Sequence, residues 1–482
     1  MKSVQMLVDG EWLSAKSTYY VINPANTDEV VAEVALGTRG DASEAVEAAH
    51  RAFASWSETS PFERAELLRK AAAIVKERIE EISRLLTLEN GKTLKDSRKE
   101  IDFAARVLHY YAEEATRIFG EWVPTLSQSV RSIVIRQPVG VAGLIVPWNF
   151  PIDLLAWKLG PALAAGCTVV IKPSSEAPVA ATEFVRAVND AGFPPGVINV
   201  IPGKASEVGM ELVENPKVVK LAFTGETETG KYILEKAAKH LKRVSLELGG
   251  NAPAIVCSDA PLEIAVSGCV RRAFSHMGQI CISINRVYVV KEIADIFVEK
   301  VLDAVAKLKV GNGLDPETDL GPMFRDNLRQ RTKEHIEDAL KKGARLLFGG
   351  TEPKGKEYEK GFFFMPTVLS GVNHQMRIMK EETFGPVMPI MVVHDHKQAL
   401  ELANDTRYGL AAYVFTRDLS RAVKLAERLE AGGIAVNVND VTELQAPFGG
   451  WKQSGIGREL SRHALESYLE YKHIRIGIQS EL

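Results

Sequence analysis

Cys281 is the residue in this chain best suited to covalent chemistry. It lies in Phe274–Arg286 (FSHMGQICISINR), three positions after Gly278 and between apolar neighbours. A cysteine that follows a glycine-containing turn is a candidate nucleophile at the end of a structural element. Free cysteines more often serve as small hydrophobic core residues, and this segment alone leaves both interpretations open.

Two distant residues offer groups that a cysteine nucleophile would need. Glu247 precedes Leu248-Gly249-Gly250, where a carboxylate has room to act as a general base, although a solvated or capping glutamate is the simpler interpretation. Asn149 lies in Pro147–Pro151 (PWNFP), and its amide could stabilise an oxyanion. The alternative for Asn149 is an Asx turn.

Three further features suit a nucleotide. Lys172 could bind ribose or phosphate oxygens and Glu382 could accept sugar hydroxyls, unless they are a surface lysine and a loop carboxylate. Gly225–Lys231 (GETETGK) matches seven positions of a P-loop, but Tyr232 replaces the Ser or Thr that binds Mg²⁺. An ATPase is therefore disfavoured, while backbone amides could still approach a phosphate. The chain has no G-x-G-x-x-G, so a standard Rossmann turn is absent.

Alternating strands and helices position these segments. Helices are expected near 152–165, 177–191, 205–214 and 229–241. The predicted strands between them are Val139–Val146, Thr168–Lys172, Val197–Ile201, Val219–Thr224 and Val244–Leu248. This order predicts a mainly parallel sheet covered on both faces, with the polar loops gathered at the carboxyl ends of the strands.

Other elements flank this region. Helices are expected after a capping box at Asp41–Glu44, over Phe62–Leu88 before Gly91, and over Ser97–Arg117. A second α/β unit spans about 252–449, with surface loops at 315–322 and 349–360. Its predicted strands are Val287–Val290, Val387–Val393, Ala411–Phe415 and Gly433–Asn437.

Two segments read as arms for subunit contact. Residues Glu121–Gln137 form neither a clear core strand nor a helix, and Tyr468–Ile478 alternates like an edge strand. A long exposed edge strand is a liability unless it is paired.

Composition narrows the function classes. The 482 residues suffice for about two to four domains. A net charge of −3 gives no basic excess for nucleic acid, and four cysteines without a C-x-x-C pair favour a reducing cytoplasm over disulfides or a zinc site. No signal peptide is evident, and prolines and charges interrupt the apolar stretch Val139–Lys172, so no membrane span is expected.

Taken together, the motifs resemble the aldehyde dehydrogenase superfamily over nearly the whole chain, from Val21–Pro24 to the C-terminal arm. The segments that carry the resemblance are Pro147–Pro151, Phe223–Gly225, Leu246–Asn251, Gly278–Cys281, Glu381–Pro386 and Pro447–Gly455. It implies an α/β fold with two Rossmann-type domains, a cofactor-binding domain (1–119 and 138–248) and a catalytic domain (249–460). A β arm (120–137 and 461–482) would serve oligomerisation, giving a homodimer or homotetramer.

The resemblance also implies the chemistry. Cys281 would attack an aldehyde, with Asn149 and the Cys281 N–H holding the oxyanion. NAD(P)+ would take the hydride, and Glu247 would activate water to hydrolyse the thioester, with no catalytic metal. Lys158 and Glu459 match positions that relay protons. The implied cofactor-binding residues are Val146, Pro147, Trp148, Lys172, Ser175, Glu176, Gly225, Glu226, Gly230, Leu248, Glu382 and Phe384.

Two departures from the family pattern bear on the cofactor. Ser175 stands where many NAD-preferring members carry Glu, so repulsion against a 2′-phosphate is removed and NADP is expected to be tolerated or preferred. A backbone shift that brings Glu176 into place would undo this. Glu226 replaces a common Ser beside the pyrophosphate, and its charge must point away or be offset.

The implied substrate pocket contains Leu154, Trp157, Ser275, Ile280, Ile282, Thr442 and Phe448. Relatives that act on succinic semialdehyde commonly carry arginines at the positions of Trp157 and Ser275, so an uncharged aliphatic, hydroxylated or aromatic aldehyde is favoured here. Asp153 and Asp440 near the mouth would also suit an aminoaldehyde. The alternatives are a CoA-acylating semialdehyde dehydrogenase and a catalytically silent protein of the same fold.

Overall fold

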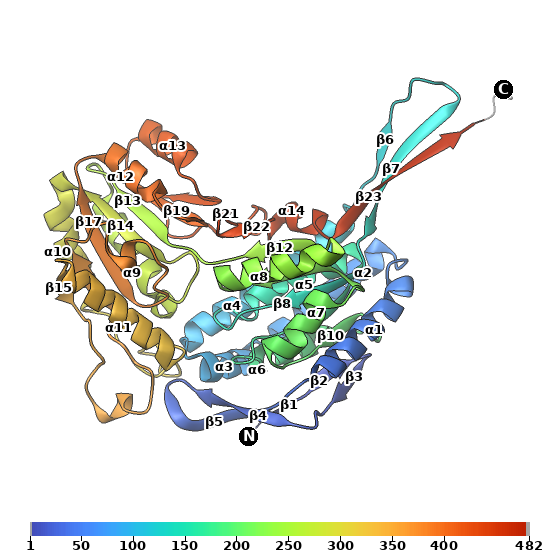
Figure 1. Cartoon of the computed structure of the whole chain (residues 1–482), viewed down its shortest axis with the longest axis horizontal. Coiled ribbons are helices and arrows are strands. Elements are labelled where there is room, and N and C mark those ends of the chain that lie inside the picture. The colour runs from blue at the N-terminus through green and yellow to red at the C-terminus, as the bar shows by residue number, and fades with distance from the viewer. Residues whose placement is uncertain (1, 479–482) are drawn as a thin grey trace.

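The computed structural model describes residues 2–478, which form two lobes and a projecting arm (Figure 1). The first lobe is built on an eight-stranded sheet in the order β22-β12-β11-β8-β9-β10-β2-β3. The five central strands run parallel, as predicted, and the added strands at both edges run antiparallel. The strands are β2 (Met6–Val8), β3 (Glu11–Leu13), β8 (Val141–Ile145), β9 (Thr168–Lys172), β10 (Ile198–Val200), β11 (Val218–Thr224), β12 (Arg243–Glu247) and β22 (Gly455–Ile456).

Helices cover both faces of this sheet. Along β8, Ala142 and Leu144 join one core and Val141 and Ile145 join the other, as the two-residue period of a strand requires. One face carries α1 (Arg39–Trp56), α7 (Met210–Glu214) and α8 (Thr227–Ala237). The other carries α2 (Pro61–Glu77), α3 (Ile79–Asn90), α4 (Leu94–Ala115), α5 (Asp153–Ala165) and α6 (Val179–Asn189).

Two local predictions in this lobe were wrong. The capping box belongs to Thr38 and Asp41, because Thr38 is the N-cap and Asp41 the third helical residue. The helix expected over Phe62–Leu88 breaks at Arg78, although Gly91 ends the second part in a left-handed conformation as expected. The helix expected over 205–214 is present, and its first half is a π-helix.

The second lobe holds a seven-stranded sheet in the order β15-β16-β17-β14-β13-β19-β20. Only β15 runs antiparallel to its neighbour among these described strands. The strands are β13 (Ala252–Val256), β14 (Ile284–Val290), β15 (Arg345–Phe348), β16 (Thr367–Ser370), β17 (Val387–Val393), β19 (Ala411–Phe415) and β20 (Gly433–Val436). The helices are α9 (Leu262–Phe274), α10 (Ala294–Val305), α11 (Asp326–Lys341), α12 (His396–Asn404) and α13 (Leu419–Arg428).

Smaller elements join the lobes. A three-stranded sheet of β1 (Lys2–Val4), β5 (Asn26–Ala35) and β4 (Thr18–Asn23) lies at the N-terminus, and β18 (Tyr408–Gly409) pairs with β21 (Trp451–Lys452). The loop expected at the surface over 315–322 is buried from Leu320 onward. A Cβ on Gly321 would lie 1.8 Å from the Gly91 carbonyl oxygen, so this loop packs tightly against the first lobe.

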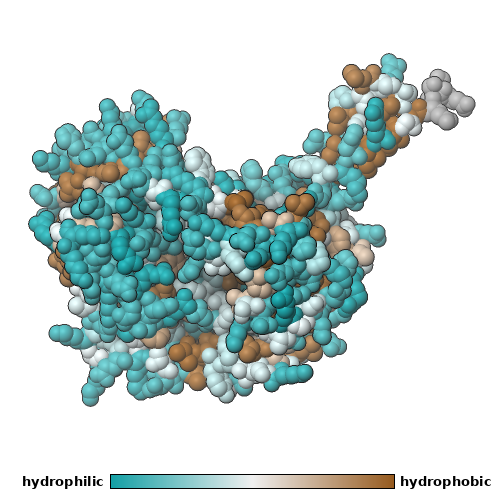
Figure 2. Space-filling view, in the orientation of Figure 1, coloured by the Kyte–Doolittle hydropathy of each residue, from teal (hydrophilic) through white to brown (hydrophobic). Residues whose placement is uncertain are grey.

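The arm unites the two segments that the sequence singled out. β23 (Leu469–Gly477) pairs along its whole length with β7 (Val130–Pro138), which also pairs with β6 (Glu121–Val123). A short helix, α14 (Ser461–Glu466), precedes β23. Figures 1 and 2 show the arm standing clear of the lobes with apolar surface on it, and Trp122, Leu126 and Tyr471 are exposed there.

The domain boundaries given above remain a prediction. β22 lies within the range expected for the catalytic domain but pairs with β12 of the first sheet, and residues 479–482 of the expected arm lie outside the described part of the chain. Between residues 2 and 478, no helix is long and apolar enough to cross a membrane.

Candidate active site

The loop that carries Cys281 is held in an unusual backbone conformation. His276, Met277 and Gly278, which follow α9, all have positive φ. The Gln279 side chain fastens the loop, donating to the His276 carbonyl oxygen at 3.0 Å and accepting from the Phe324 N–H at 2.9 Å. Two hydrogen bonds of this kind hold the loop more firmly than a free turn would.

Burial sets the protonation state of the Cys281 thiol. Burial, together with the carboxylates of Glu382 and Glu247, raises the pKa of the thiol to about 12. The thiol is therefore protonated at neutral pH in the protein alone. A Cβ on Gly250 would lie 2.1 Å from the Cys281 carbonyl oxygen, so only glycine allows the segment after β12 to pass this close to the loop.

Asn149 faces the same space as Cys281. Its side chain is 5% exposed, and Nδ2 donates to the Gln279 carbonyl oxygen at 3.0 Å. An amide nitrogen carries two hydrogens, so one remains for an oxyanion. The Asn149 carbonyl oxygen accepts from Lys92 Nζ at 2.7 Å, which holds the residue in place from behind.

Glu247 ends β12, and its side chain is buried. The residue is 2% exposed, and neither carboxylate oxygen has a hydrogen-bond partner within residues 2–478. Burial, followed by the nearby Glu459 carboxylate, raises the pKa of Glu247 well above its usual value. A Cβ on Gly449 would lie 2.8 Å from Glu247 Oε1, so glycine at that position leaves the carboxylate its space.

Lys158 and Glu459 form a buried ion pair beside Glu247. Their charged atoms lie 2.6 Å apart, and both side chains are almost fully buried. Lys158 Nζ, from α5, also donates to Thr224 Oγ1 at 2.6 Å and to the Leu154 carbonyl oxygen at 3.2 Å. The structure thus brings the expected relay positions together with the expected base.

A cleft between the lobes has the features of a dinucleotide site. A pocket of about 80 Å³ in this cleft is lined by Pro147, Trp148, Asn149, Leu154, Thr224, Gly225, Glu226, Leu248, Gly249, Cys281, Arg325, Leu328, Arg331, Glu382 and Phe384. Glu382 Oε1 accepts from the Gly250 N–H at 2.9 Å, and burial raises the pKa of Glu382 to about 7. Gly249 and Gly230 fit the cleft because a Cβ would meet Glu382 Oε2 at 2.6 Å or Leu248 Cδ2 at 2.4 Å.

The residues expected at the adenosine ribose lie at the end of β9. Lys172 is buried, which lowers its pKa to about 8, and Nζ donates to the Pro173 carbonyl oxygen at 2.9 Å. The Val146 N–H donates to the Lys172 carbonyl oxygen at 3.2 Å, so the two expected contacts are adjacent. Ser175 Oγ donates to the Gly203 carbonyl oxygen at 3.0 Å.

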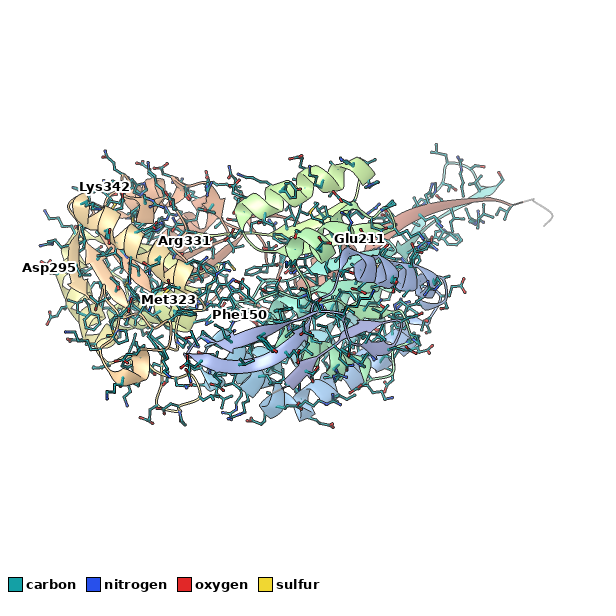
Figure 3. All side chains as sticks on the ribbon, turned by 60° about the horizontal axis from the view of Figure 1, so that its bottom comes forward. Phe150, Glu211, Asp295, Met323, Arg331 and Lys342 are labelled. Atoms are coloured by element: carbon teal, nitrogen blue, oxygen red, sulfur yellow. The ribbon has the colours of Figure 1, made fainter. Side chains whose placement is uncertain are left out.

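Two glutamates of the first lobe face arginines of the second lobe. Glu176 forms an ion pair with Arg325, which the sequence analysis did not anticipate. Glu226 is mostly exposed and lies 3.9 Å from an Arg331 nitrogen, so the charge that lacked an explanation has a cation to offset it. Arg331 lies on α11 and Phe150 on the other side of the junction between the lobes (Figure 3).

A second cavity, of about 420 Å³, opens on the other side of Cys281 and Asn149. All seven residues expected in the substrate pocket line it: Leu154, Trp157, Ser275, Ile280, Ile282, Thr442 and Phe448. The Trp157 ring meets the Phe448 ring edge-on, with centroids 5.0 Å apart. Lining residues that the sequence analysis missed include Lys92, Glu100, Phe103, Arg106, Arg272 and His276.

Comparison with known proteins decides the family. The model described as "Aldehyde dehydrogenase family" matches residues 12–474. The chain belongs to the aldehyde dehydrogenase family. It is 44% identical to the Escherichia coli K12 protein named succinate-semialdehyde dehydrogenase [NADP(+)] over 98% of each chain. It is 40% identical to betaine aldehyde dehydrogenase of Bacillus subtilis over 98% of this chain and 97% of the relative.

Solved structures agree. A crystal structure described as an E. coli NADP-dependent enzyme superposes with a TM-score of 0.96 at 43% identity, covering 99% of this chain and 98% of that one. Betaine aldehyde dehydrogenase from Staphylococcus aureus in complex with NAD+ gives 0.96 at 39% identity, covering 99% and 96%. The predicted fold class is confirmed, and this aldehyde dehydrogenase is an oxidoreductase whose cofactor is NAD(P).

Proposed function

We propose that this aldehyde dehydrogenase oxidises an aldehyde to the carboxylic acid with NAD(P)+ through a Cys281 thiohemiacetal and thioester, with water activated by Glu247. The observation that supports this proposal most strongly is that two cavities meet at the same residues. Cys281 and Asn149 line both the dinucleotide cleft and the larger cavity, so one thiol can face a cofactor on one side and an aldehyde on the other.

Each step has a residue suited to it. The Cys281 thiol must lose its proton to solvent before the thiolate attacks, because burial and nearby carboxylates raise its pKa. The free N–H of Asn149 Nδ2 would stabilise the oxyanion that forms. A bound NAD(P)+ would supply the hydride acceptor. Glu247 would then take a proton from water as that water attacks the thioester, and the Lys158–Glu459 pair would pass the proton onward.

The free carboxylate of Glu247 argues against the two alternatives. An acyl transfer to CoA needs no general base for water, yet Glu247 occupies a buried position with nothing else to bind among the described residues. A catalytically silent protein of this fold would have no reason to keep a buried, unpaired carboxylate, because burial of such a group costs stability.

The substrate proposed is an uncharged aldehyde. Several relatives are named for succinate or glutarate semialdehyde, which carry a carboxylate. In this chain, one of the two positions of the expected arginines holds the Trp157 indole, and at the other Ser275 Oγ donates to the Arg271 carbonyl oxygen at 2.6 Å. Neither side chain can form a bidentate pair with a carboxylate.

The proposal is tested by measuring kcat/KM over a panel of aldehydes with NAD+ and with NADP+. The panel contains propanal, benzaldehyde, glyceraldehyde, betaine aldehyde and succinic semialdehyde. We expect acid and reduced cofactor in equal amounts, and loss of activity after alkylation of Cys281. Dinucleotide binding without turnover of any aldehyde would support a silent protein, and acyl-CoA formation on addition of CoA would support the acylating alternative.

Three further properties belong to the proposal. NADP is expected to be tolerated or preferred because Ser175 presents no carboxylate and Glu176 is engaged with Arg325. The apolar arm supports a homodimer or homotetramer, which light scattering would distinguish. Four free cysteines support a cytoplasmic location.

A further inference from the structure

Two buried side chains in the substrate cavity have polar atoms with no partner inside the protein. His276 is 6% exposed and Trp157 is 5% exposed. Neither ring nitrogen of His276 nor Nε1 of Trp157 has a hydrogen-bond partner within residues 2–478. Buried polar groups are nearly always hydrogen-bonded, so unpartnered ones in a cavity beside a nucleophile indicate groups that a ligand completes.

A third polar group of the same cavity is Asp153, at the start of α5. Its Oδ1 is buried and lacks a partner among the described residues. His276, Trp157 and Asp153 line the cavity together with Cys281 and Asn149. We call His276, Trp157 and Asp153 the polar trio.

Burial disfavours charge on the polar trio. Burial and the Lys92 ammonium hold the pKa of His276 well below its usual value. Burial and the Glu100 carboxylate raise the pKa of Asp153 well above its usual value. The imidazole, the indole N–H and the carboxyl group can form hydrogen bonds with hydroxyl groups, whereas burial disfavours the charges that would bind a carboxylate or an ammonium group.

The charged side chains of the cavity are already paired with one another. Lys92 bonds to Glu100, and Arg272 Nη2 donates to Asp440 Oδ2 at 2.5 Å. Lys99 pairs with Asp96 at 2.9 Å and Arg106 with Asp102 at 2.6 Å. Arg271, the remaining cation of the lining, is exposed to solvent.

Apolar side chains lie beside the nucleophile and beside Trp157. Ile280 and Ile282 flank Cys281, and the Phe103 and Phe448 rings pack on either side of Trp157, with centroids 6.4 and 5.0 Å away. The polar trio therefore provides hydrogen-bonding positions among apolar neighbours in the cavity that Cys281 lines.

We propose that the preferred substrate is an aldehyde carrying hydroxyl groups on carbons near the carbonyl, bound through the polar trio. This inference rests on the function proposed above and narrows its substrate to one class. The hydroxyl groups complete the hydrogen bonds of His276, Trp157 and Asp153, and an aldehyde without them leaves these buried atoms unpaired. A site built to bond a hydroxyl rejects the analogue that lacks it.

Glyceraldehyde and propanal form a matched pair for the test, because both have three carbons and differ by two hydroxyl groups. The measurement is kcat/KM for each on the intact enzyme, at concentrations expressed as free aldehyde because the two hydrate differently. We expect glyceraldehyde to be favoured by about 10- to 100-fold, the usual effect of one or two unpaired buried groups. Succinic semialdehyde is the third probe, and it tests whether the exposed Arg271 binds a substrate carboxylate.

Two variants locate the preference. Trp157→Phe removes Nε1–H but keeps a ring against Phe448, so it should lower kcat/KM for glyceraldehyde about tenfold more than for propanal. Phe103→Leu changes the same part of the wall without touching a polar atom, and should leave the ratio of the two substrates unchanged.

The outcomes separate this inference from the proposed function. Equal kcat/KM for glyceraldehyde and propanal, or a clear preference for succinic semialdehyde, overturns the hydroxyaldehyde assignment while leaving aldehyde oxidation intact. An unchanged ratio in Trp157→Phe removes the polar trio as its cause. If no aldehyde in the panel is oxidised, it is the proposed function that fails.

Discussion

Replacing Glu247 by glutamine should separate the two halves of the proposed reaction. The substitution keeps the shape of the side chain and removes the proton acceptor, while Cys281 and Asn149 remain in place. The first turnover should still release close to one equivalent of reduced cofactor per active site, because acylation of Cys281 precedes attack by water. Steady-state turnover should fall by about 10² to 10⁴, the usual contribution of a general base.

The size of this effect follows from the setting of the carboxylate. Glu247 binds nothing else within residues 2–478, so its loss breaks no hydrogen bond. The slower step corresponds to about 2.7–5.4 kcal/mol in the activation barrier. Stopped-flow absorbance of the reduced cofactor measures the burst and the steady state in one experiment. Glu235→Gln, a largely exposed glutamate on α8, is the matched control and should change neither.

The same variant has a stability signature with a defined sign. The pKa of Glu247 is raised on folding, so the folded state holds the proton more tightly than the unfolded state does. The wild type therefore loses stability as pH rises from the unfolded pKa through the folded pKa, and Glu247→Gln does not. Its midpoint of thermal unfolding should exceed that of the wild type at pH 8 but not at pH 4. A variant with wild-type turnover, or one that loses burst and steady state alike, would refute the assignment of Glu247.

Three other outcomes are expected. Ser175→Glu should shift the ratio of kcat/KM toward NAD+, and an unchanged ratio would remove the basis for expecting NADP. Alkylation of Cys281 by iodoacetamide in the cofactor-free enzyme should be slow at pH 7, and its rate should rise about tenfold per pH unit up to pH 10, because the thiol pKa is about 12. A rate that levels off near pH 8 would contradict this. The Glu89 carboxylate accepts hydrogen bonds from the Val179 and Ala180 N–H groups at 2.8 Å at the start of α6. Glu89→Ala should therefore lower the free energy of unfolding, measured by urea titration, by about 2–4 kcal/mol. A change below about 0.5 kcal/mol would contradict a stabilising role for these hydrogen bonds.

The sequence predicts the central elements well because their signals are local. The strands at Thr168–Lys172, Val387–Val393 and Ala411–Phe415 are short apolar runs that reappear with the same bounds. The N-terminal strands were not predicted because they are short and pair with strands distant in the sequence, as Leu7 pairs with Val200. The break between α2 and α3 at Arg78 was not predicted because the helical spacing of apolar residues continues across it.

The candidate site divides in the same way. The residues that motifs mark, such as Cys281, Glu247 and Asn149, lie close together as the resemblance implies. Lys92 and Glu100 carry no motif, and only the packing of α4 against α5 brings them to the cavity. His276 is visible in the sequence, but nothing there shows that both ring nitrogens lack partners. Such a feature depends on every neighbour at once and appears only when the fold is assembled.

The close approach of Gly250 to the Cys281 carbonyl oxygen has a consequence for how this chain can be divided. Glu247 ends a strand of the first sheet, Cys281 precedes a strand of the second, and the short segment between β12 and β13 runs beside both. Neither lobe expressed as a separate fragment would contain a complete set of reacting groups. Fragments cut at this segment would be active only if they reassociated, so the reaction requires both lobes together.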